Sequence, residues 1–409
     1  MNRLVLIGNG FDLAHGLKTS YADFINWYWE KRALAFATCY SPISEDPLCK
    51  FIDLNNTQWN VNAYMGLNLM PGLQNEVLTG TDIIQYIAEN EKKYKIEYAP
   101  FFENILSSIE TKRWVDIENE YYRLLIEFSI DRPSIYNLQE LNKQLQFLQK
   151  LLIEYLGEVS KKCADKIKQI EDELYAPINT GDIAVAGQKV WKEHVNYWQT
   201  DGYTKLENRQ QLFGLERSTL DEAQVYKVTP WAQRVGDYPL LSRLPNRVLL
   251  LNFNYTSTLR QYQHIDITEL IHIHGKLEEP ANVIFGYGDE LDGDFAKLQN
   301  LNDNESLKNV KSIRYLETPN YRRALEFIEA EPFQVYIMGH SCGNSDRTLL
   351  NTIFEHPNCV SIKPYFYIKE DGTDNYIELV QNISRNFTDM KLMRDRVVNK
   401  TQCEPLVKE

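Results

Sequence analysis

The sequence predicts an α/β protein in which an open parallel sheet is interrupted by a large helical insertion. A buried strand at residues 3–10 runs into a glycine turn, and the next run of this type comes only at 247–253. Both runs are apolar without alternation, which is typical of strands covered on both faces. Helical periodicity dominates between them. We therefore expect an α/β domain at 1–25 and 245–409 and a mostly helical insertion at 26–244.

Further apolar runs complete the expected sheet. They lie at 270–274, 283–286 and 333–339. A last run at 360–368 contains Pro364, which cannot donate to a ladder, so it predicts an edge strand or two separate pieces.

Helical periodicity marks the insertion at 82–94, 101–110 and 114–130. The clearest helix is expected from 138 to 174. Its leucines follow a 3-4 spacing that makes one apolar seam, which predicts packing inside a helical bundle.

Composition excludes several classes of protein. The 409 residues are 43% hydrophobic, enough for a large core. The net charge of −13 makes the chain a poor candidate for binding nucleic acid over its whole surface. No apolar stretch approaches the roughly 18 residues of a membrane-spanning helix. The six cysteines form no C-x-x-C and no signal-peptide core precedes Gly8, so we expect a cytoplasmic location.

The turn after the first strand is the first candidate site. Gly8, Asn9 and Gly10 follow the strand, and Asp12 and His15 come next. Glycines let a backbone approach a phosphate closely, and amides at a following helix start favour negative charge. The spacing completes neither G-x-G-x-x-G nor a Walker A loop. The turn is interpreted as a nucleotide site, with a plain tight turn as the alternative.

Polar residues also end the second buried strand. Asn254, Tyr255 and Thr256 follow it, and ligands of open α/β sheets bind outside the carboxyl ends of the strands. Asn254 therefore stands where a site is expected. Equally, Asn254 or Thr256 would suit the cap of a helix that begins near Ser257.

Two histidines lie close together at 270–274. On a strand His272 and His274 share a face, which permits a metal site, with Asp289 and Glu290 as the acidic candidates for further ligands. No third ligand has a recognisable spacing, so we expect no metal. We interpret His274 as a base or hydrogen-bond donor in the site and His272 as a core histidine.

The segment after residues 333–339 contains Gly339, Ser341 and Asp346. G-H-S-C-G superficially matches a G-x-S-x-G nucleophile elbow, but His356 is the only histidine that follows, and an acid such as Asp346 lies only ten residues before it. A phosphate- or ribose-binding loop capped by Asp346 is the preferred interpretation.

Acidic residues alternate in the helical part. Asp116, Glu118 and Glu120 follow Trp114, and Asp116 and Glu120 are i,i+4 neighbours. A solvated acidic face is the first interpretation. The alternative is that the insertion folds over the pocket and lends it a carboxylate from Asp116 or Glu118.

Five segments together resemble the AbiH proteins of bacterial phage abortive infection. They are the opening LVLIGNGFDLAHGLKTSYADF, the W-x-D-x-E segment at 114–118, LLNFNYTSTL at 250–259, IHIHG at 271–275 and VYIMGHSCGNSD at 335–346. The opening is the most specific of them.

The same landmarks are similar, more distantly, to the sirtuin-like NAD-binding fold, which implies a Rossmann-like sheet. That family has a G-A-G-x-S turn, a T-x-N-x-D segment, an H-G pair and a late G-x-S loop. The resemblance implies that Asn254 and His274 act on the nicotinamide ribose. It implies a cofactor-binding set of Gly8, Asn9, Gly10, Asp12, Gly339, Ser341 and Asp346, with His15 and Tyr255 as further candidates.

The chain also departs from the sirtuin-like pattern. Thr256 stands where that family has its aspartate, and Asp12 replaces the serine of the glycine turn. The arginine that follows the turn and the four-cysteine zinc module are missing, which makes protein deacylation a poor fit.

The resemblance thus implies a cytoplasmic bacterial defence effector that hydrolyses NAD or a related nucleotide. The alternative is a non-catalytic nucleotide sensor whose helical region binds a phage or host protein. A metal-dependent nuclease or hydrolase that uses His272 and His274 is a third hypothesis. A homo-oligomer stays open.

Overall fold

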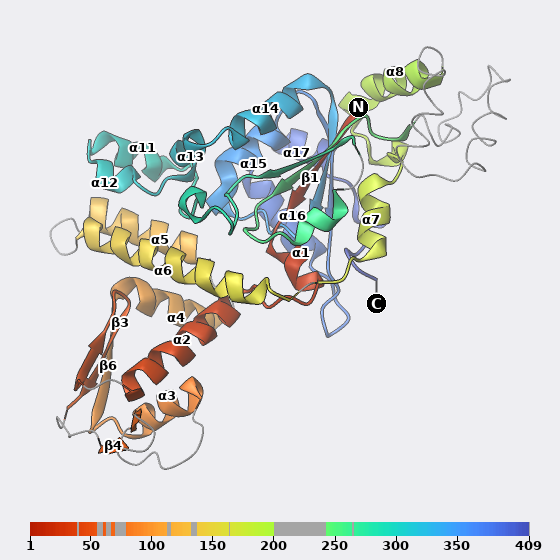
Figure 1. Cartoon of the computed structure of the whole chain (residues 1–409). Coiled ribbons are helices and arrows are strands. Elements are labelled where there is room, and N and C mark those ends of the chain that lie inside the picture. The colour runs from red at the N-terminus through yellow and green to blue at the C-terminus, as the bar shows by residue number, and fades with distance from the viewer. Residues whose placement is uncertain are drawn as a thin grey trace. The chain divides into compact units, whose positions relative to one another are not determined.

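The computed structural model (Figure 1) describes residues 1–38, 41–54, 60–62, 67–69, 79–112, 116–131, 137–162, 164–199, 243–263 and 266–408. The chain forms two compact units. Unit 1 comprises Met1–Lys18, Val159–Asp292 and Val310–Glu409, and unit 2 comprises Thr19–Glu158 and Gly293–Asn309.

Unit 1 contains a parallel sheet and most of the short helices. Its elements are β1 (Asn2–Ile7), α1 (Asn9–Ala14), α7 (Lys168–Tyr175), η2 (Thr180–Asp182), η3 (Val185–Gly187), α8 (Gln188–Gln199), β7 (Val248–Asn252), η7 (Thr258–Tyr262), β8 (Thr268–His272), η8 (Pro280–Asn282), α13 (Lys311–Arg314), η9 (Tyr315–Glu317), α14 (Asn320–Ala330), β9 (Phe333–Met338), η10 (Asn344–Asp346), α15 (Arg347–Phe354), β10 (Cys359–Tyr365), α16 (Tyr376–Arg385), α17 (Met390–Arg396) and η11 (Lys400–Gln402).

The five strands of unit 1 pair in the order β10-β9-β1-β7-β8, and all four pairings are parallel. The first strand of the chain is therefore central. Its register sets Ile7 beside Asn252 of β7 and Met338 of β9, so these three strands end side by side. The polar residues that follow them consequently gather at one edge of the sheet.

Apolar side chains cover both faces of this sheet. On one face Leu4 and Leu6 belong to a buried cluster with residues of α14, α15, α16 and α17. On the other, Val5 and Ile7 belong to a cluster with Phe11 of α1 and Ile170 and Leu174 of α7. Burial on both faces explains why the strands carry continuous apolar runs, and it confirms the predicted α/β class with a parallel sheet.

Four predicted strands, at 3–10, 247–253, 270–274 and 333–339, correspond to β1, β7, β8 and β9, but β8 ends at His272 and leaves His274 outside the strand. The run at 360–368 is the edge strand β10, and it continues through Pro364, which pairs with Ile337. An edge position has one side without a ladder partner, and this is the place where a sheet tolerates proline.

The strand predicted at 283–286 is wrong. Val283, Ile284 and Phe285 are buried, but they form no strand. The Ile284 N–H donates to the His274 carbonyl, and the Ile284 carbonyl accepts from the Tyr255 hydroxyl. Burial therefore accounts for the apolar run. Its backbone makes isolated hydrogen bonds in place of the regular bonds of a β-ladder.

Unit 2 is mixed rather than purely helical. Its elements are α2 (Tyr21–Thr38), β2 (Ile43–Glu45), β3 (Cys49–Asp53), β4 (Asn60–Asn62), β5 (Leu67–Leu69), α3 (Gly80–Glu89), β6 (Tyr94–Tyr98), α4 (Pro100–Lys112), α5 (Ile117–Ile126), the π-helical turn η1 (Glu127–Asp131), α6 (Leu138–Val159), α11 (Gly293–Asn300) and α12 (Asn304–Leu307). The strands β2, β3 and β6 form an antiparallel sheet, and β4 pairs with β5. The helices expected at 82–94, 101–110 and 114–130 correspond to α3, α4 and α5 with η1, although α3 ends at Glu89.

The single helix predicted from 138 to 174 is wrong, because two helices occupy this range. The seam residues Leu141, Leu145, Leu148 and Leu152 are buried in α6, which ends at Val159. A polar stretch follows, and the Ile167 N–H donates to the Tyr262 hydroxyl at 2.8 Å. Helix α7 then follows, and its apolar side chains pack on the sheet of unit 1.

The predicted domain limits, 1–25 with 245–409 against 26–244, stay a prediction. The contacts do show that α7, which the sequence assigns to the insertion, packs on the sheet through Ile170 and Leu174. Cys49, Cys342, Cys359 and Cys403 are buried free thiols. Among the described helices, none has both the length and the apolar character needed to cross a membrane.

Candidate functional site

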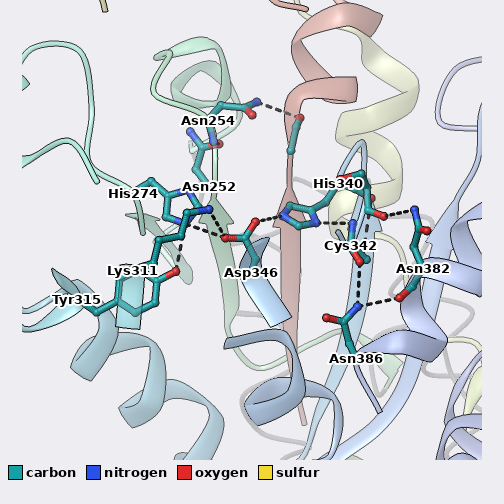
Figure 2. Close-up of polar contacts among 12 residues, drawn as sticks. Asn252, Asn254, His274, Lys311, Tyr315, His340, Cys342, Asp346, Asn382 and Asn386 are labelled. Atoms are coloured by element: carbon teal, nitrogen blue, oxygen red, sulfur yellow. Dashed lines mark hydrogen bonds and ion pairs between the residues drawn. The ribbon is translucent and has the colours of Figure 1, made fainter. Parts of the chain in front are cut away.

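The candidate site lies where β1, β7 and β9 end. Asn254, two residues beyond β7, donates from Nδ2 to the Gly8 carbonyl at 3.0 Å (Figure 2). Its own N–H donates to Asn252 Oδ1 at 3.1 Å. The helix cap suggested for Asn254 or Thr256 is wrong, because η7 begins after Ser257 without a side-chain cap. Asn254 instead joins the ends of two neighbouring strands.

The predicted glycines permit a close approach of two loops. The Gly10 N–H donates to the Gly339 carbonyl at 2.8 Å. A Cβ atom on Gly8 would lie 2.5 Å from the His340 Cα atom, so only glycine fits there. The loops after β1 and β9 thus pack backbone to backbone, and this packing alone accounts for the glycines. Asn9, at the start of α1, is exposed.

Asp12 and Thr256, the two departures from the sirtuin-like pattern, contact each other. The Thr256 hydroxyl donates to Asp12 Oδ2 at 2.5 Å, and both residues are buried. The other oxygen, Oδ1, is buried and has no hydrogen-bond partner. Burial raises the pKa of Asp12, against the hydrogen bond from Thr256. Relative to the sirtuin-like pattern, the carboxylate now lies after β1 and the hydroxyl after β7, so the two groups have exchanged positions.

The side chains of His15 and Tyr255 make hydrogen-bond contacts within the protein. The Nδ1 and Nε2 atoms of His15 lie 2.7 Å from the Phe11 carbonyl and 2.7 Å from the Tyr262 hydroxyl. The buried Tyr255 hydroxyl donates to the Ile284 carbonyl at 3.0 Å. Both contacts fix loops at this edge of the sheet.

The two histidines of 270–274 have different environments. His272 Nδ1 lies 3.2 Å from Asn252 Nδ2, whereas His274 Nε2 lies 3.2 Å from Asp346 Oδ1 and 3.1 Å from the Tyr315 hydroxyl. The His274 and Tyr315 rings are stacked. Among the described residues, no group of three or more histidine, cysteine and acidic side chains is arranged to hold a metal ion.

Asp346 is the centre of a buried charged cluster (Figure 2). Its Oδ1 accepts from the Lys311 ammonium at 2.8 Å and lies near His274, while Oδ2 lies 3.7 Å from His340 Nε2. Burial alone would raise the pKa of Asp346, but Lys311 and both histidines hold it well below its usual range. Burial and the Lys311 charge lower the pKa of His274, against the opposing effect of Asp346.

The loop that carries Asp346 is clamped in an unusual backbone conformation. Gly339 and Cys342 have φ values of 75° and 54°. The Cys342 N–H donates to His340 Nδ1 at 3.0 Å. Two amides hold the loop: Asn382 of α16 donates to the Ser341 carbonyl, and Asn386, directly after α16, donates to the Cys342 carbonyl, both at 2.9 Å. The positive φ of Cys342 is thus stabilised by its neighbours.

The nucleophile-elbow alternative fails on geometry. Ser341 is exposed after the end of β9, but the His356 ring lies against Phe333, where β9 begins. A six-residue strand separates its two ends by roughly 17 Å. Ser341 and His356 therefore lie at opposite edges of the sheet.

The acidic residues of α5 belong to unit 2 and have local roles. Asp116 caps α5 by accepting the Asn119 N–H at 3.0 Å. Glu118 is buried, and the buried Glu120 accepts from the Ser108 hydroxyl at 2.8 Å. The solvated acidic face is therefore wrong for Glu118 and Glu120. Trp114 lies outside the described residues.

Lys311, Tyr315, Asn382 and Asn386 are components of the site that the sequence does not single out. All four come from helices or turns without a recognisable motif. The buried Lys311 is held at the start of α13, where its N–H donates to the Tyr287 carbonyl at 2.8 Å. No local pattern indicates these residues, because only the tertiary fold brings them to Asp346 and Cys342.

The stability of unit 1 should fall in mild acid because of His340. Burial lowers its pKa to about 4 from an ordinary value of 6.5. The unfolded chain then binds a proton that the native chain excludes, so this contribution is complete above pH 6.5 and is lost as the pH falls to about 4. The loss is about 3 kcal/mol. Urea unfolding across this range measures it.

His340→Asn is the matched variant for this measurement. Asparagine keeps an acceptor for the Cys342 N–H and does not titrate. The fall in stability should become smaller by about the His340 contribution, while those of His272 and His274, whose pKa values burial also lowers, remain. An unchanged pH dependence in His340→Asn would contradict the assignment.

Comparison with known proteins identifies one family. The model of the family described as bacteriophage abortive infection AbiH matches residues 4–367. No curated protein and no solved structure matches the chain significantly. The matched range includes β1 from Leu4 onward, the whole of β7, β8 and β9, and the loop that carries Asp346. The chain therefore belongs to the AbiH family of bacteriophage abortive infection proteins.

Proposed function

We propose that this chain acts in phage abortive infection by binding NAD at the carboxyl edge of its parallel sheet and hydrolysing the nicotinamide–ribose bond. The family connects the chain to abortive infection. The nucleotide and the reaction are inferred from the sirtuin-like landmarks and from the residues gathered at the edge.

The strand order is the observation that carries this proposal. Numbered along the chain, the five strands run 3-2-1-4-5 across the sheet, with β1 as strand 1 and β9 as strand 4. This is the order of the first five strands of the classic dinucleotide-binding sheet. Ligands of such sheets bind where the order reverses, which here is between β1 and β9. Gly8 and Gly339 follow those two strands, and Asn254 is bonded to Gly8.

The geometry suggests a role for each catalytic candidate. Nicotinamide leaves NAD as a neutral base, so the reaction requires no strong acid. Asn254 is half-buried at the edge and would orient the attacking water through its side-chain oxygen. His274, positioned by Asp346 and Tyr315, would take the proton of that water, an effect of about 10²–10⁴-fold in rate.

A non-catalytic nucleotide sensor is the second candidate, and burial favours it. The His274 side chain is only 5% exposed, and its Nε2 atom contacts two protein groups, the Asp346 carboxylate and the Tyr315 hydroxyl. The Gly10 amide is bonded to Gly339 rather than left for a phosphate. In this form the chain would bind NAD without cleaving it, and the helical region would bind a phage or host protein.

The test is a time course of NAD with the purified full-length chain, with and without added divalent metal. Asn254→Ala and His274→Ala should each abolish hydrolysis. Asn358→Ala is the matched control, because Asn358 also donates to a backbone carbonyl, Ile328 at 2.9 Å, but at the opposite edge of the sheet. Circular dichroism checks that each variant is folded.

Each outcome separates the candidates. Hydrolysis that needs Asn254 and His274 but not Asn358 or metal supports the proposal. Wild-type rates in Asn254→Ala and His274→Ala show that the site assignment is wrong. Calorimetric binding without hydrolysis favours the sensor, and a metal requirement favours a metal-dependent hydrolase. If the chain neither binds nor hydrolyses NAD, both nucleotide hypotheses are contradicted.

A further inference from the structure

Asp12 differs from the other buried aspartates of unit 1 in the part of the chain that is described. Asp182 pairs with Lys363 at 3.2 Å, Asp289 with Arg347 at 3.2 Å, and Asp346 with Lys311 at 2.8 Å. Asp12 is 1% exposed, yet the side chains that hydrogen-bond toward it are neutral, the Thr256 hydroxyl among them, and its buried Oδ1 has no hydrogen-bond partner. Each of these three aspartates pairs with a lysine or an arginine, and among the described buried aspartates of the unit Asp12 alone has no such partner.

An unpaired buried carboxylate is costly, because burial removes the water that would solvate its charge. A protein keeps such a group where a ligand completes its interactions, as in active sites. Asp12 lies at the edge where strand order reverses. Its neighbours include Thr256, Thr258 and Asn254, all of which hydrogen-bond toward the carboxylate.

We propose that Asp12 is a catalytic carboxylate whose free oxygen faces the positive charge of an oxidised pyridine dinucleotide. This inference rests on the proposed function and names its substrate class: dinucleotides with a cationic nicotinamide ring, in preference to the reduced form. Two opposite charges about 4 Å apart attract strongly at a site shielded from water. Both NAD⁺ and the ribosyl cation formed from it carry the positive charge that would face Asp12, whereas the nicotinamide ring of NADH is neutral.

The chemical step balances. The bond between the ribose C1′ atom and the nicotinamide nitrogen breaks, and its electron pair leaves with neutral nicotinamide. Asp12 Oδ1 stabilises the positive charge left on the ribose. Water then forms a bond to C1′, and its proton passes to His274 and on to solvent. Thr256 is a positioning residue, since its hydroxyl fixes Oδ2 and leaves Oδ1 free.

The test compares binding of NAD⁺ and NADH by calorimetry, in the full chain carrying His274→Ala so that no turnover disturbs the titration. With Asp12 present, NAD⁺ should bind about tenfold more tightly than NADH. Asp12→Asn keeps the acceptor for Thr256 and removes the charge, so the two affinities should become equal within about twofold. Asp182→Asn is the matched control and should leave the preference unchanged.

Thermal unfolding gives a readout that needs no ligand. Asp12→Asn should unfold at a higher temperature than the parent, because it removes an unpaired buried charge. Asp182→Asn should unfold at a lower temperature, because it removes the partner of Lys363. Thr256→Val keeps the charge of Asp12, so in the His274→Ala background it should retain the preference for NAD⁺. In the chain that keeps His274, Thr256→Val should lower turnover about tenfold.

The outcomes distinguish this inference from the proposed function. An NAD⁺ preference that Asp12→Asn abolishes supports the contact between Asp12 and the cationic ring. If the wild-type chain also hydrolyses no NAD, the hydrolysis proposal and the catalytic role of Asp12 fail, and the preference for the oxidised dinucleotide stands. Equal binding of NAD⁺ and NADH by the parent overturns the inference. So does a preference that survives Asp12→Asn, wild-type turnover in Asp12→Asn, or a lower unfolding temperature for that variant.

Discussion

Asp346→Asn should lower the free energy of unfolding by about 3–5 kcal/mol, which is the usual cost of breaking a buried ion pair by removing one partner. Asparagine has nearly the same shape, so the loss arises from charge. The Lys311 side chain is 1% exposed, and its ammonium would stay buried without the carboxylate 2.8 Å away. Urea unfolding at neutral pH, followed by circular dichroism, measures the change.

Lys311→Met provides the second arm of a double-mutant cycle. It leaves the Asp346 carboxylate without its ammonium, although His274 and His340 remain close, so a loss of about 2–4 kcal/mol is expected. The double variant should lose less than the two single losses added together, because no unpaired charge is left. Single variants that each cost under about 0.5 kcal/mol would contradict a strong pair.

The strands of unit 1 could be predicted because burial on both faces leaves an unmistakable pattern. Leu4 to Ile7 and Leu249 to Leu251 are continuous apolar runs. The same pattern misleads at 283–286, since a buried irregular segment needs the same side chains as a buried strand. The helix prediction across residues 160–167 fails for a related reason, because periodicity does not show when a chain changes the surface on which it packs.

The site could be predicted only in part. Asn254 and Asp346 stand just after strands, and position after a strand fixes the edge at which a residue lies. His274 can be predicted for the same reason. Lys311 was missed because it enters from a short helix, 35 residues before its partner Asp346. The bond between Thr256 and Asp12 spans 244 residues, so it exists only through the pairing of β1 with β7.

Gly339→Ala should destabilise the chain by about 2–5 kcal/mol through two separate effects. The φ value of Gly339 is 75°, and a side chain in this region costs about 1–2 kcal/mol. In addition, a Cβ atom there would lie 2.1 Å from the Phe11 nitrogen, so the loops after β1 and β9 would have to separate. Overpacking of this kind costs about 1–3 kcal/mol.

Gly16→Ala separates the two effects. Gly16 has nearly the same φ value, 74°, but a Cβ atom there would meet nothing within 4 Å. Its substitution should therefore cost only the backbone part, about 1–2 kcal/mol. Urea unfolding of both variants measures the difference, which is the energy of the close approach between the two loops. Equal losses would mean that these loops can separate cheaply. The Gly10–Gly339 contact could then open to admit a ligand between β1 and β9, where the strand order reverses, without a large loss of stability.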